Sequence, residues 1–261
     1  MATAAFDFSA WLSALPFLLG AAGVTWLLSL PLRNVAIVDS LWSLMLFMAG
    51  VIYALGADPR APRLSLVLWL LALWAIRLAF YLTARNAGKG EDRRYRDMRE
   101  RHDPGFGVKS LYLVFWLQAL LAWVISLPLL GAFTSTQPLN GLDYLGVALW
   151  IIGFVFEAGG DWQLARFKKN PLNADQVMDG GLWRYTRHPN YFGEFCIWWG
   201  FWCMALAAGA WWSAVGPALL TYLLLRISGI RLLERDIGKR RPQYADYVLK
   251  TNAFFPGPPR N

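Results

Sequence analysis

The chain has 261 residues, of which 57% are hydrophobic, 16% are aromatic and only 16% are charged. Ordinary soluble domains carry about 25% charged residues, so this composition excludes a soluble globular protein and predicts an integral membrane protein. The net charge of +8 does not indicate a nucleic-acid partner, because basic and acidic residues are interleaved, as in GEDRRYRDMRERHD at 90–103.

Apolar runs of about 18 residues or more, long enough to cross a bilayer as helices, recur along the chain. In chain order the predicted spans are 9–30, 38–56, 64–84, 110–132, 142–163, 192–208 and 211–232. Only AAGA separates the last two spans, which predicts a tight hairpin. The predicted fold class is all-α: a polytopic membrane helix bundle with about seven transmembrane helices, in which residues 1–261 form a single integral membrane domain.

Most of the 25 lysines and arginines lie in the loops after the first, third and fifth spans and in the C-terminal segment. The loop between the second and third spans holds only Arg60 and Arg63. Because loops on the cytosolic side carry the excess of basic residues, this distribution predicts an outside N-terminus and a cytosolic C-terminus. We expect a protein of the bacterial inner (cytoplasmic) membrane.

Ionisable residues inside the third span form a polar stripe, because Arg77, Tyr81 and Arg85 follow one another at four-residue spacing. A charged side chain inside a bilayer costs about 2.5–3.5 kcal/mol, so each one requires an explanation. Arg77 either serves a functional site or is satisfied by neighbouring helices. Asp39, at the entrance to the second span, is either part of the same site or the N-cap of that helix.

The fifth and seventh spans also carry ionisable residues. Glu157 and Asp161 are four apart, and Gly159 and Gly160 between them let a ligand or another helix approach closely. Basic residues continue the fifth span at Arg166, Lys168 and Lys169. The seventh span holds two arginines, Arg226 and Arg231, and Arg226 is deep enough to be costly. The cations near the predicted cytosolic end indicate a cavity for an anionic, phosphate-bearing ligand, with helix pairing as the alternative.

The stretch RYTRHPNYFGEFCIWWGF at 184–201 places polar residues directly before an aromatic run. Pro189 fits the first turn of a helix, so Asn190, Tyr191 and Glu194 lie on the first turns of the sixth span, and Arg187 and His188 precede it. We interpret this motif as a helix start at the cavity mouth; an interfacial aromatic belt is the alternative. Cys196 and Cys203 fit plain packing, and no spacing of metal ligands is present.

Several motifs resemble a known family. GGLWRYTRHPNYFGEFCIWWG, followed by LLLR and then by YADYVLKTNAFFP, resembles the C-terminal half of the steroid 5α-reductase family. VDSLW, GEDRRY and that C-terminal pattern together resemble a largely bacterial branch of the same superfamily, which has no assigned function, over residues 34–256. The superfamily also includes sterol C14 reductases and isoprenylcysteine carboxyl methyltransferases. The resemblance implies a membrane helix bundle with an NADPH site that opens to the cytosol, formed by the C-terminal half, residues 134–261.

The resemblance also implies site residues. Asp161, Lys168, Asn190 and Arg226 match cofactor contacts of the 5α-reductases, although Lys168 stands where those enzymes have arginine. Trp183 and Tyr191 are similar to cofactor contacts of the sterol reductases. Together with neighbouring polar residues, the predicted cofactor-binding set is Asp161, Lys168, Trp183, Arg187, His188, Asn190, Tyr191, Glu194, Arg226, Arg231 and Tyr244.

The chain departs from the 5α-reductases at the residues that activate the carbonyl group. Their tyrosine three residues before the third-helix arginine is Trp74 here, which has no phenolic proton, and the second span contains no glutamate. This departure argues against a steroid as substrate. We predict instead that Tyr81 is the proton donor and that Arg77 or Asp39 sets its protonation.

The leading hypothesis is a membrane-embedded reductase that uses NADPH to reduce a carbon–carbon double bond in a lipophilic, steroid- or isoprenoid-like enone. One alternative is a methyltransferase that uses S-adenosylmethionine on a lipid or prenylated thiol, because that family shares the RHP turn and a late stretch matched by Glu234, Tyr244 and Tyr247. The other is a non-enzymatic membrane protein, which Trp74 favours. The substrate's identity, the choice between NADPH and NADH, and the oligomeric state stay open.

Overall fold

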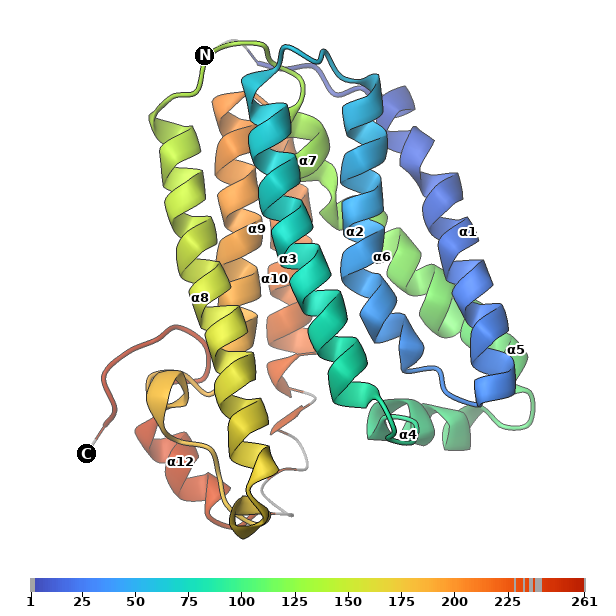
Figure 1. Cartoon of the computed structure of the whole chain (residues 1–261), viewed down its shortest axis with the longest axis vertical. Coiled ribbons are helices and arrows are strands. Elements are labelled where there is room, and N and C mark those ends of the chain that lie inside the picture. The colour runs from blue at the N-terminus through green and yellow to red at the C-terminus, as the bar shows by residue number, and fades with distance from the viewer. Residues whose placement is uncertain (1–2, 228, 232, 235–236, 238–240, 261) are drawn as a thin grey trace. The chain divides into compact units, whose positions relative to one another are not determined.

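The computed structural model describes all residues except 1–2, 228, 232, 235–236, 238–240 and 261. Its internal contacts divide the chain into two compact units, Met1–Asn140 with Met204–Gly216, and Gly141–Cys203 with Pro217–Asn261. All regular elements in the described ranges are helices, so the predicted all-α class is confirmed (Figure 1). The predicted cofactor half, 134–261, overlaps the second unit.

Five helical stretches among the described residues are long and apolar enough to cross a membrane: α1 (Phe8–Leu32), α2 (Ile37–Gly56), α3 (Pro62–Asn86), the run Phe106–Ala132 and α8 (Gly141–Lys169). They coincide with the first five predicted spans, which makes all five candidate membrane-spanning helices. α9 (Pro189–Ala207) starts with polar residues and contains several tryptophans, which lower its mean hydropathy. The total of seven spans and the orientation of the termini stay predictions.

In the first unit, α2 packs against both α1 and α3 (Figure 1). The hydroxyl of Ser43 on α2 donates to the carbonyl of Ala75 on α3 at 2.9 Å. The run Phe106–Ala132 consists of α5 (Phe106–Ser110), a π-helical stretch η1 (Leu111–Trp116), α6 (Leu117–Ile125) and α7 (Leu127–Ala132). Trp11 and Trp123 stack with their ring centroids 3.6 Å apart, and each indole N–H donates to the other's carbonyl, which joins α1 to α6.

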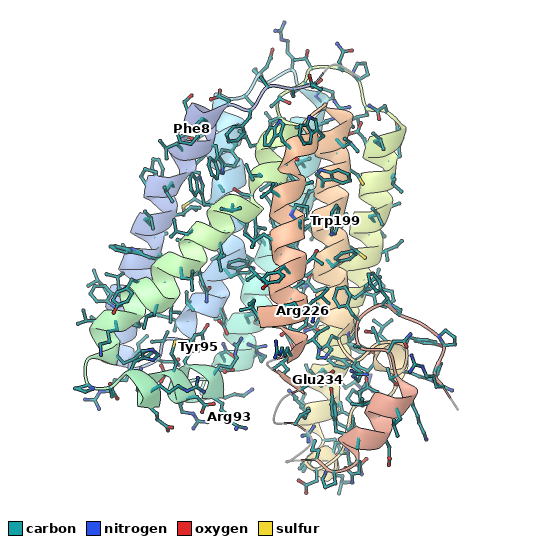
Figure 2. The ribbon with its side chains drawn as sticks, turned by 180° about the vertical axis from the view of Figure 1, so that it is seen from behind. Phe8, Arg93, Tyr95, Trp199, Arg226 and Glu234 are labelled. Carbon is teal, nitrogen blue, oxygen red and sulfur yellow. The ribbon has the colours of Figure 1, made fainter. Side chains whose placement is uncertain are left out.

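The charged segment after α3, which the sequence analysis treated as a loop, contains the helix α4 (Arg93–His102). Asp92 caps it, because its carboxylate accepts the backbone N–H of Arg94 at 2.9 Å. Figure 2 places Arg93 and Tyr95 of α4 at the opposite end of the first unit from Phe8. The GEDRRY motif is therefore a helix start.

A tight turn follows α9. Gly209 has a φ of 88°, and the N–H of Ala210 donates to the carbonyl of Ala205 at 2.9 Å. Glycine suits this position because other residues rarely adopt positive φ. The predicted hairpin turn at AAGA is therefore confirmed. The helical segments that follow are η4 (Trp211–Ala214), α10 (Val215–Tyr222) and a π-helical stretch, η5 (Leu223–Ile227).

In the second unit, α8 and α9 approach each other through glycines. A Cβ at Gly153 would lie 2.5 Å from the carbonyl oxygen of Gly193, and one at Gly200 would lie 2.6 Å from that of Gly146. Two turns further along α8, a Cβ at Gly160 would lie 3.0 Å from Pro189. The glycines recur every seven residues, so bare backbone lines one face of α8. Gly160 therefore serves the helix pairing that the sequence analysis kept as an alternative.

The end of the second unit is built from short segments. The 3-10 turns η2 (Pro171–Asn173) and η3 (Gly181–Arg184) follow α8, and α12 (Tyr244–Lys250) precedes the last residues. Two backbone hydrogen bonds tie the segment before α9 to this tail: the N–H of Arg187 donates to the carbonyl of Asn252, and the N–H of Gly257 to that of Tyr185. As predicted, α9 begins at Pro189.

Candidate functional site

The predicted catalytic residues Asp39, Arg77 and Tyr81 all belong to the first unit. Arg85 links two of them: its guanidinium carbon lies 6.0 Å from the ring centroid of Tyr81, and its Nη2 lies 3.9 Å from Oδ2 of Asp39. Arg77 stands one turn before Tyr81 on the same face of α3, and its Nε and Nη2 atoms are shielded from solvent. The polar stripe predicted on α3 therefore reaches Asp39 on α2.

Asp39 has closer partners on α4. Oδ2 of Asp39 accepts Nη2 of Arg94 at 2.8 Å, and Oδ1 accepts the hydroxyl of Tyr95 at 2.6 Å. The N-cap alternative for Asp39 is wrong, because α2 starts at Ile37 after the cap residue Ala36. Burial and the neighbouring Asp39 carboxylate raise the pKa of Tyr95 well above its usual value. This phenol is therefore protonated at neutral pH and donates to Asp39.

Sequence reasoning did not select Arg94 and Tyr95 as site residues. Both lie in GEDRRY, and Asp39 lies in VDSLW, so the two motifs contact each other across more than fifty residues. The available signal was the joint occurrence of the two motifs. The amide of Gln118 on α6 donates to the hydroxyl of Tyr95 at 3.2 Å and extends the cluster.

In the second unit, Glu234 collects three polar side chains. Arg187 donates Nε to Oε1 at 2.8 Å and Nη2 to Oε2 at 3.0 Å, so the pair is bidentate. His188 Nε2 lies 2.9 Å from Oε1, and the hydroxyl of Tyr244 donates to the same oxygen at 3.1 Å. Figure 2 marks Glu234 in this unit. The predicted residues Arg187, His188 and Tyr244 are thus brought together around a carboxylate that was named only for the methyltransferase alternative.

Arg187 also holds the chain's tail. Its Nη1 donates to the carbonyl of Thr251 at 2.6 Å and to that of Val248 at 3.3 Å, and the residue is only 8% exposed. All three guanidinium nitrogens therefore donate within the unit. In this structure Arg187 acts as a positioning residue for the start of α9; its role as a cofactor contact stays a prediction.

The ionisation of Glu234 follows from these partners. Burial by itself would raise its pKa, but the hydrogen bonds from His188 and Arg187 and their charges outweigh burial and lower the pKa of Glu234 to about 2. Burial, followed by the Glu234 charge, raises the pKa of Tyr244. At neutral pH the cluster therefore contains a carboxylate and a protonated phenol.

A second group of predicted residues lies at the contact between α8 and α9. Nδ2 of Asn190 donates to Oδ1 of Asp161 at 3.4 Å, and Asp161 is 4% exposed. The indole N–H of Trp183 donates to the carbonyl of Gly160 at 3.0 Å. Tyr191 stacks on His188 with centroids 5.6 Å apart and so joins this group to the Glu234 cluster. A carboxylate, an amide and two aromatic rings are therefore neighbours here.

The remaining predicted cofactor residues are Lys168, Glu194, Arg226 and Arg231. Lys168 lies seven residues past Asp161 on α8, about 10 Å further along the helix, with an exposed side chain. Arg226 lies in η5 with a side chain that other residues do not cover (Figure 2), and its depth in a bilayer stays a prediction. Arg231 is also exposed, and Glu194 is half-buried. Both arginines stand near a break in regular α-helix, which hydropathy does not reveal.

In the described part of the chain, no group of three or more His, Cys, Asp or Glu side chains is arranged to hold a metal ion. Cys196 and Cys203 are both free and buried. Trp74 is fully buried in the first unit, as a packing residue would be.

Residues 25–251 match a family described as a protein of unknown function, DUF1295, which is related to the steroid 5α-reductases. The chain is 25% identical to an uncharacterized protein of Schizosaccharomyces pombe, C594.04c, over 93% of the chain and 78% of that protein. No solved structure gives a significant match.

Shorter matches come from named reductases. The chain is 35% identical over 79 residues to 3-oxo-5-alpha-steroid 4-dehydrogenase 1 of Mus musculus, and 32% identical over 85 residues to the Homo sapiens protein of that name. These matches cover 30% and 33% of the chain and span only 29% and 30% of the length of the two proteins. The expected resemblance to steroid 5α-reductases is thus confirmed at the level of a distant relation. These relatives are eukaryotic, so the bacterial inner membrane stays a prediction.

Proposed function

We propose that this chain, which belongs to the DUF1295 family of proteins of unknown function, is a membrane-embedded reductase that uses NADPH to reduce a carbon–carbon double bond conjugated with a carbonyl group. The family's relation to the steroid 5α-reductases supports a reductase of steroid-like molecules, and the five apolar helices support a substrate that is drawn from the bilayer. Because Trp74 replaces the reductases' tyrosine, the proposed substrate class also includes isoprenoid enones.

The donors and acceptors at the start of α9 fit a dinucleotide. The amide of Asn190 can both donate and accept hydrogen bonds, and the Asp161 carboxylate beside it accepts hydroxyl or amide N–H groups. Trp183 and Tyr191 add flat apolar surfaces. Pro189 fills the space at Gly160, so a dinucleotide would contact these polar and aromatic groups and not the backbone of Gly160.

Bound NADPH would supply the hydride, and the chain's residues would bind it, orient it and handle the proton. In the first unit we assign the role of proton donor to the hydroxyl of Tyr81, because Arg85 stands over its ring and Arg77 lies one turn away. A neighbouring cation favours the phenolate, which makes the phenol a better proton donor. The observation that carries the assignment is the Asp39–Arg85–Tyr81 arrangement.

The methyltransferase alternative has one observation in its favour. Tyr244 donates to Glu234, and these are two of the residues that resemble that family's late motif. A ligand that binds only the folded state raises thermal stability, so the alternatives are separable by melting the detergent-purified chain with NADPH or with S-adenosylmethionine. We expect a higher melting temperature with NADPH alone. Stabilisation by S-adenosylmethionine alone would refute the reductase, and indifference to both ligands would favour a non-enzymatic protein.

Site variants test the residue assignments. We expect Asn190→Ala and Arg226→Ala to lose stabilisation by NADPH. Tyr81→Phe should keep that stabilisation and lose NADPH oxidation when a 3-oxo-4-ene steroid or an isoprenoid enone is added. Tyr222→Phe, at an exposed tyrosine, serves as the matched control and should keep both. A fully active Tyr81→Phe protein would show that the proton comes from another group.

A further inference from the structure

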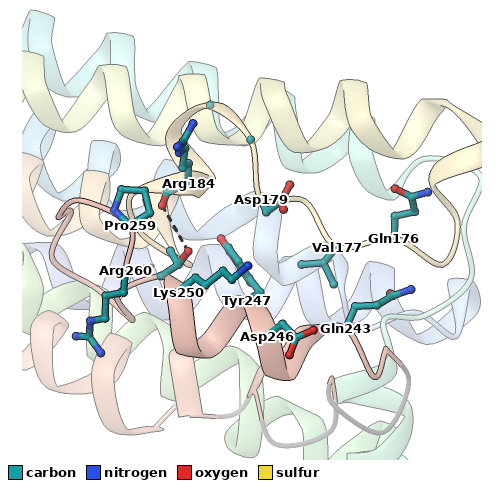
Figure 3. A pocket seen from close by; sticks show the side chains of 13 residues that line it. Gln176, Val177, Asp179, Arg184, Gln243, Asp246, Tyr247, Lys250, Pro259 and Arg260 are labelled. Carbon is teal, nitrogen blue, oxygen red and sulfur yellow. Dashed lines mark hydrogen bonds between the residues drawn. The ribbon is translucent and has the colours of Figure 1, made fainter.

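A pocket of about 1010 Å³ opens within the second unit. Residues 176–184 form one wall, and α12 with residues 259–260 forms the other (Figure 3). Binding pockets for small molecules and cofactors commonly enclose about 300–1,000 Å³, so this one is large enough for a nucleotide. Two of the predicted cofactor residues, Trp183 and Tyr244, belong to the segments that form these walls, but neither lines the pocket itself.

Basic residues gather at one end of the pocket: Arg184, Lys250 and Arg260. Two hydrogen bonds hold their backbones together: the side-chain hydroxyl of Thr251 donates to the carbonyl of Arg184 at 3.4 Å, and the backbone N–H of Arg260 donates to the carbonyl of Lys250 at 2.8 Å. Figure 3 draws these residues around Pro259 at that end, with the guanidinium groups of Arg184 and Arg260 pointing to opposite sides and the ammonium group of Lys250 pointing towards Tyr247. The positive charge at this end would attract a phosphate, which the long, exposed side chains of Arg184 and Lys250 could approach.

The other end of the pocket is polar without cations. Gln176 and Gln243 stand there on opposite walls, next to Val177, with Asp179 and Asp246 towards the middle (Figure 3). Amide side chains donate to and accept from the edges of a base, and carboxylates accept sugar hydroxyls. A Cβ at Gly180 would meet nothing within 4 Å, so the wall leaves open space there. A phosphate at one end, a sugar in the middle and a base at the other end match this order.

The pocket adjoins the predicted cofactor residues. Tyr247 lines the pocket and donates its hydroxyl to the carbonyl of Trp183, whose indole N–H donates to Gly160 on α8. Arg184, the next residue, belongs to the pocket wall. The segment Trp183–Arg184 is therefore shared by the pocket and by the predicted cofactor group.

We propose that this pocket binds the phosphorylated adenosine end of a nucleotide and that Arg184 and Lys250 recognise a phosphate on its ribose. The inference rests on the proposed function, and it selects NADPH over NADH, which lacks that phosphate. Losing one charge-assisted hydrogen bond of about 1.5 kcal/mol weakens binding roughly tenfold.

The test is a titration of the full-length, detergent-purified chain with four probes: NADPH, NADH, adenosine 2′,5′-bisphosphate and inorganic phosphate. The variants are Arg184→Gln and Lys250→Gln, which keep the length of these exposed side chains. Lys169→Gln removes the same charge from an exposed site on α8 outside the pocket. We expect each pocket variant to bind NADPH and the bisphosphate about tenfold more weakly and NADH unchanged, while Lys169→Gln binds all probes as the wild type does.

The outcomes separate the two proposals. Binding of the bisphosphate without binding of NADPH would uphold the pocket and overturn the reductase. Equal affinity for NADPH and NADH, unaffected by the pocket variants, would overturn the pocket assignment and leave the reductase intact. Inorganic phosphate that binds as tightly as the bisphosphate would reduce the pocket to an anion site and refute nucleotide recognition. A chain that binds none of the four probes would refute both proposals.

Discussion

The two units each centre on a carboxylate that accepts from an arginine and a tyrosine. In the first unit Asp39 accepts Arg94 at 2.8 Å and Tyr95 at 2.6 Å. In the second unit Glu234 accepts Arg187 at 2.8 Å and Tyr244 at 3.1 Å. The same pairing chemistry thus appears on α2 in one unit and beside α12 in the other.

The two clusters differ in the other hydrogen-bond partners of their arginines, Arg94 and Arg187. Arg94 also binds Asp92, which is two residues away and caps the same helix. Arg187 also binds the carbonyls of Val248 and Thr251, more than sixty residues away. The Asp39 cluster therefore attaches one short helix to the first unit, whereas the Glu234 cluster assembles the end of the second. The energetic consequences of breaking them should differ accordingly.

The largest effect is expected for Arg187→Ala. This change removes a buried bidentate partner of Glu234 and the bonds to the tail, and breaking a buried ion pair costs about 3–5 kcal/mol. Denaturant unfolding in detergent measures the loss. Arg187→Lys keeps the positive charge but lacks the paired guanidinium donors that bind Glu234, so it should lose less stability than Arg187→Ala. If both variants were as stable as the wild type, the cluster would not hold the second unit together.

Glu234→Gln should have an intermediate effect that depends on pH. The pKa of Glu234 is lowered from 4.5 to about 2, so the ionised carboxylate stabilises the fold fully above pH 4.5, and this contribution is lost as the pH falls from 4.5 towards 2. The variant should be less stable than the wild type at pH 6 by about 1–3 kcal/mol. Thermal melting of the wild type and the variant at pH 6 and near pH 2 checks that the difference in stability shrinks in acid. A constant difference would contradict an ionised Glu234.

The smallest effect is expected for Asp39→Asn. Arg94 keeps a side chain that is 35% exposed, and the amide oxygen of asparagine still accepts from Tyr95, so the loss should be about 1 kcal/mol. Because the closest partners of Asp39 lie on α4, amide hydrogen exchange should quicken in residues 93–102 and stay unchanged in α12. Ser40→Ala, which removes only an exposed hydroxyl contact with Thr83, is the control. Faster exchange throughout the chain would show that the Asp39 cluster supports more than α4.

Local patterns were sufficient for much of the fold. Five helices follow from long, mostly apolar runs, and the start of α9 follows from Pro189, because proline suits the first turn of a helix. The helix α4 was missed because a run of alternating charges has no apolar periodicity. Its cap, Asp92, was the visible signal. The exposed side chain of Arg226 could not be predicted, because hydropathy indicates which segment is apolar and not which way one of its side chains faces.

For the site, the motifs identified the participants but not their partners. Arg187, His188 and Tyr244 were selected from the sequence, yet the atom that joins them belongs to Glu234, 47 residues beyond Arg187. Helix type and position in the chain depend on interactions between near neighbours, so the sequence alone is enough to locate them. Which carboxylate meets which arginine, and where the pocket between residues 176–184 and α12 opens, depends on how distant segments fold back on one another. Only the tertiary structure decides these contacts.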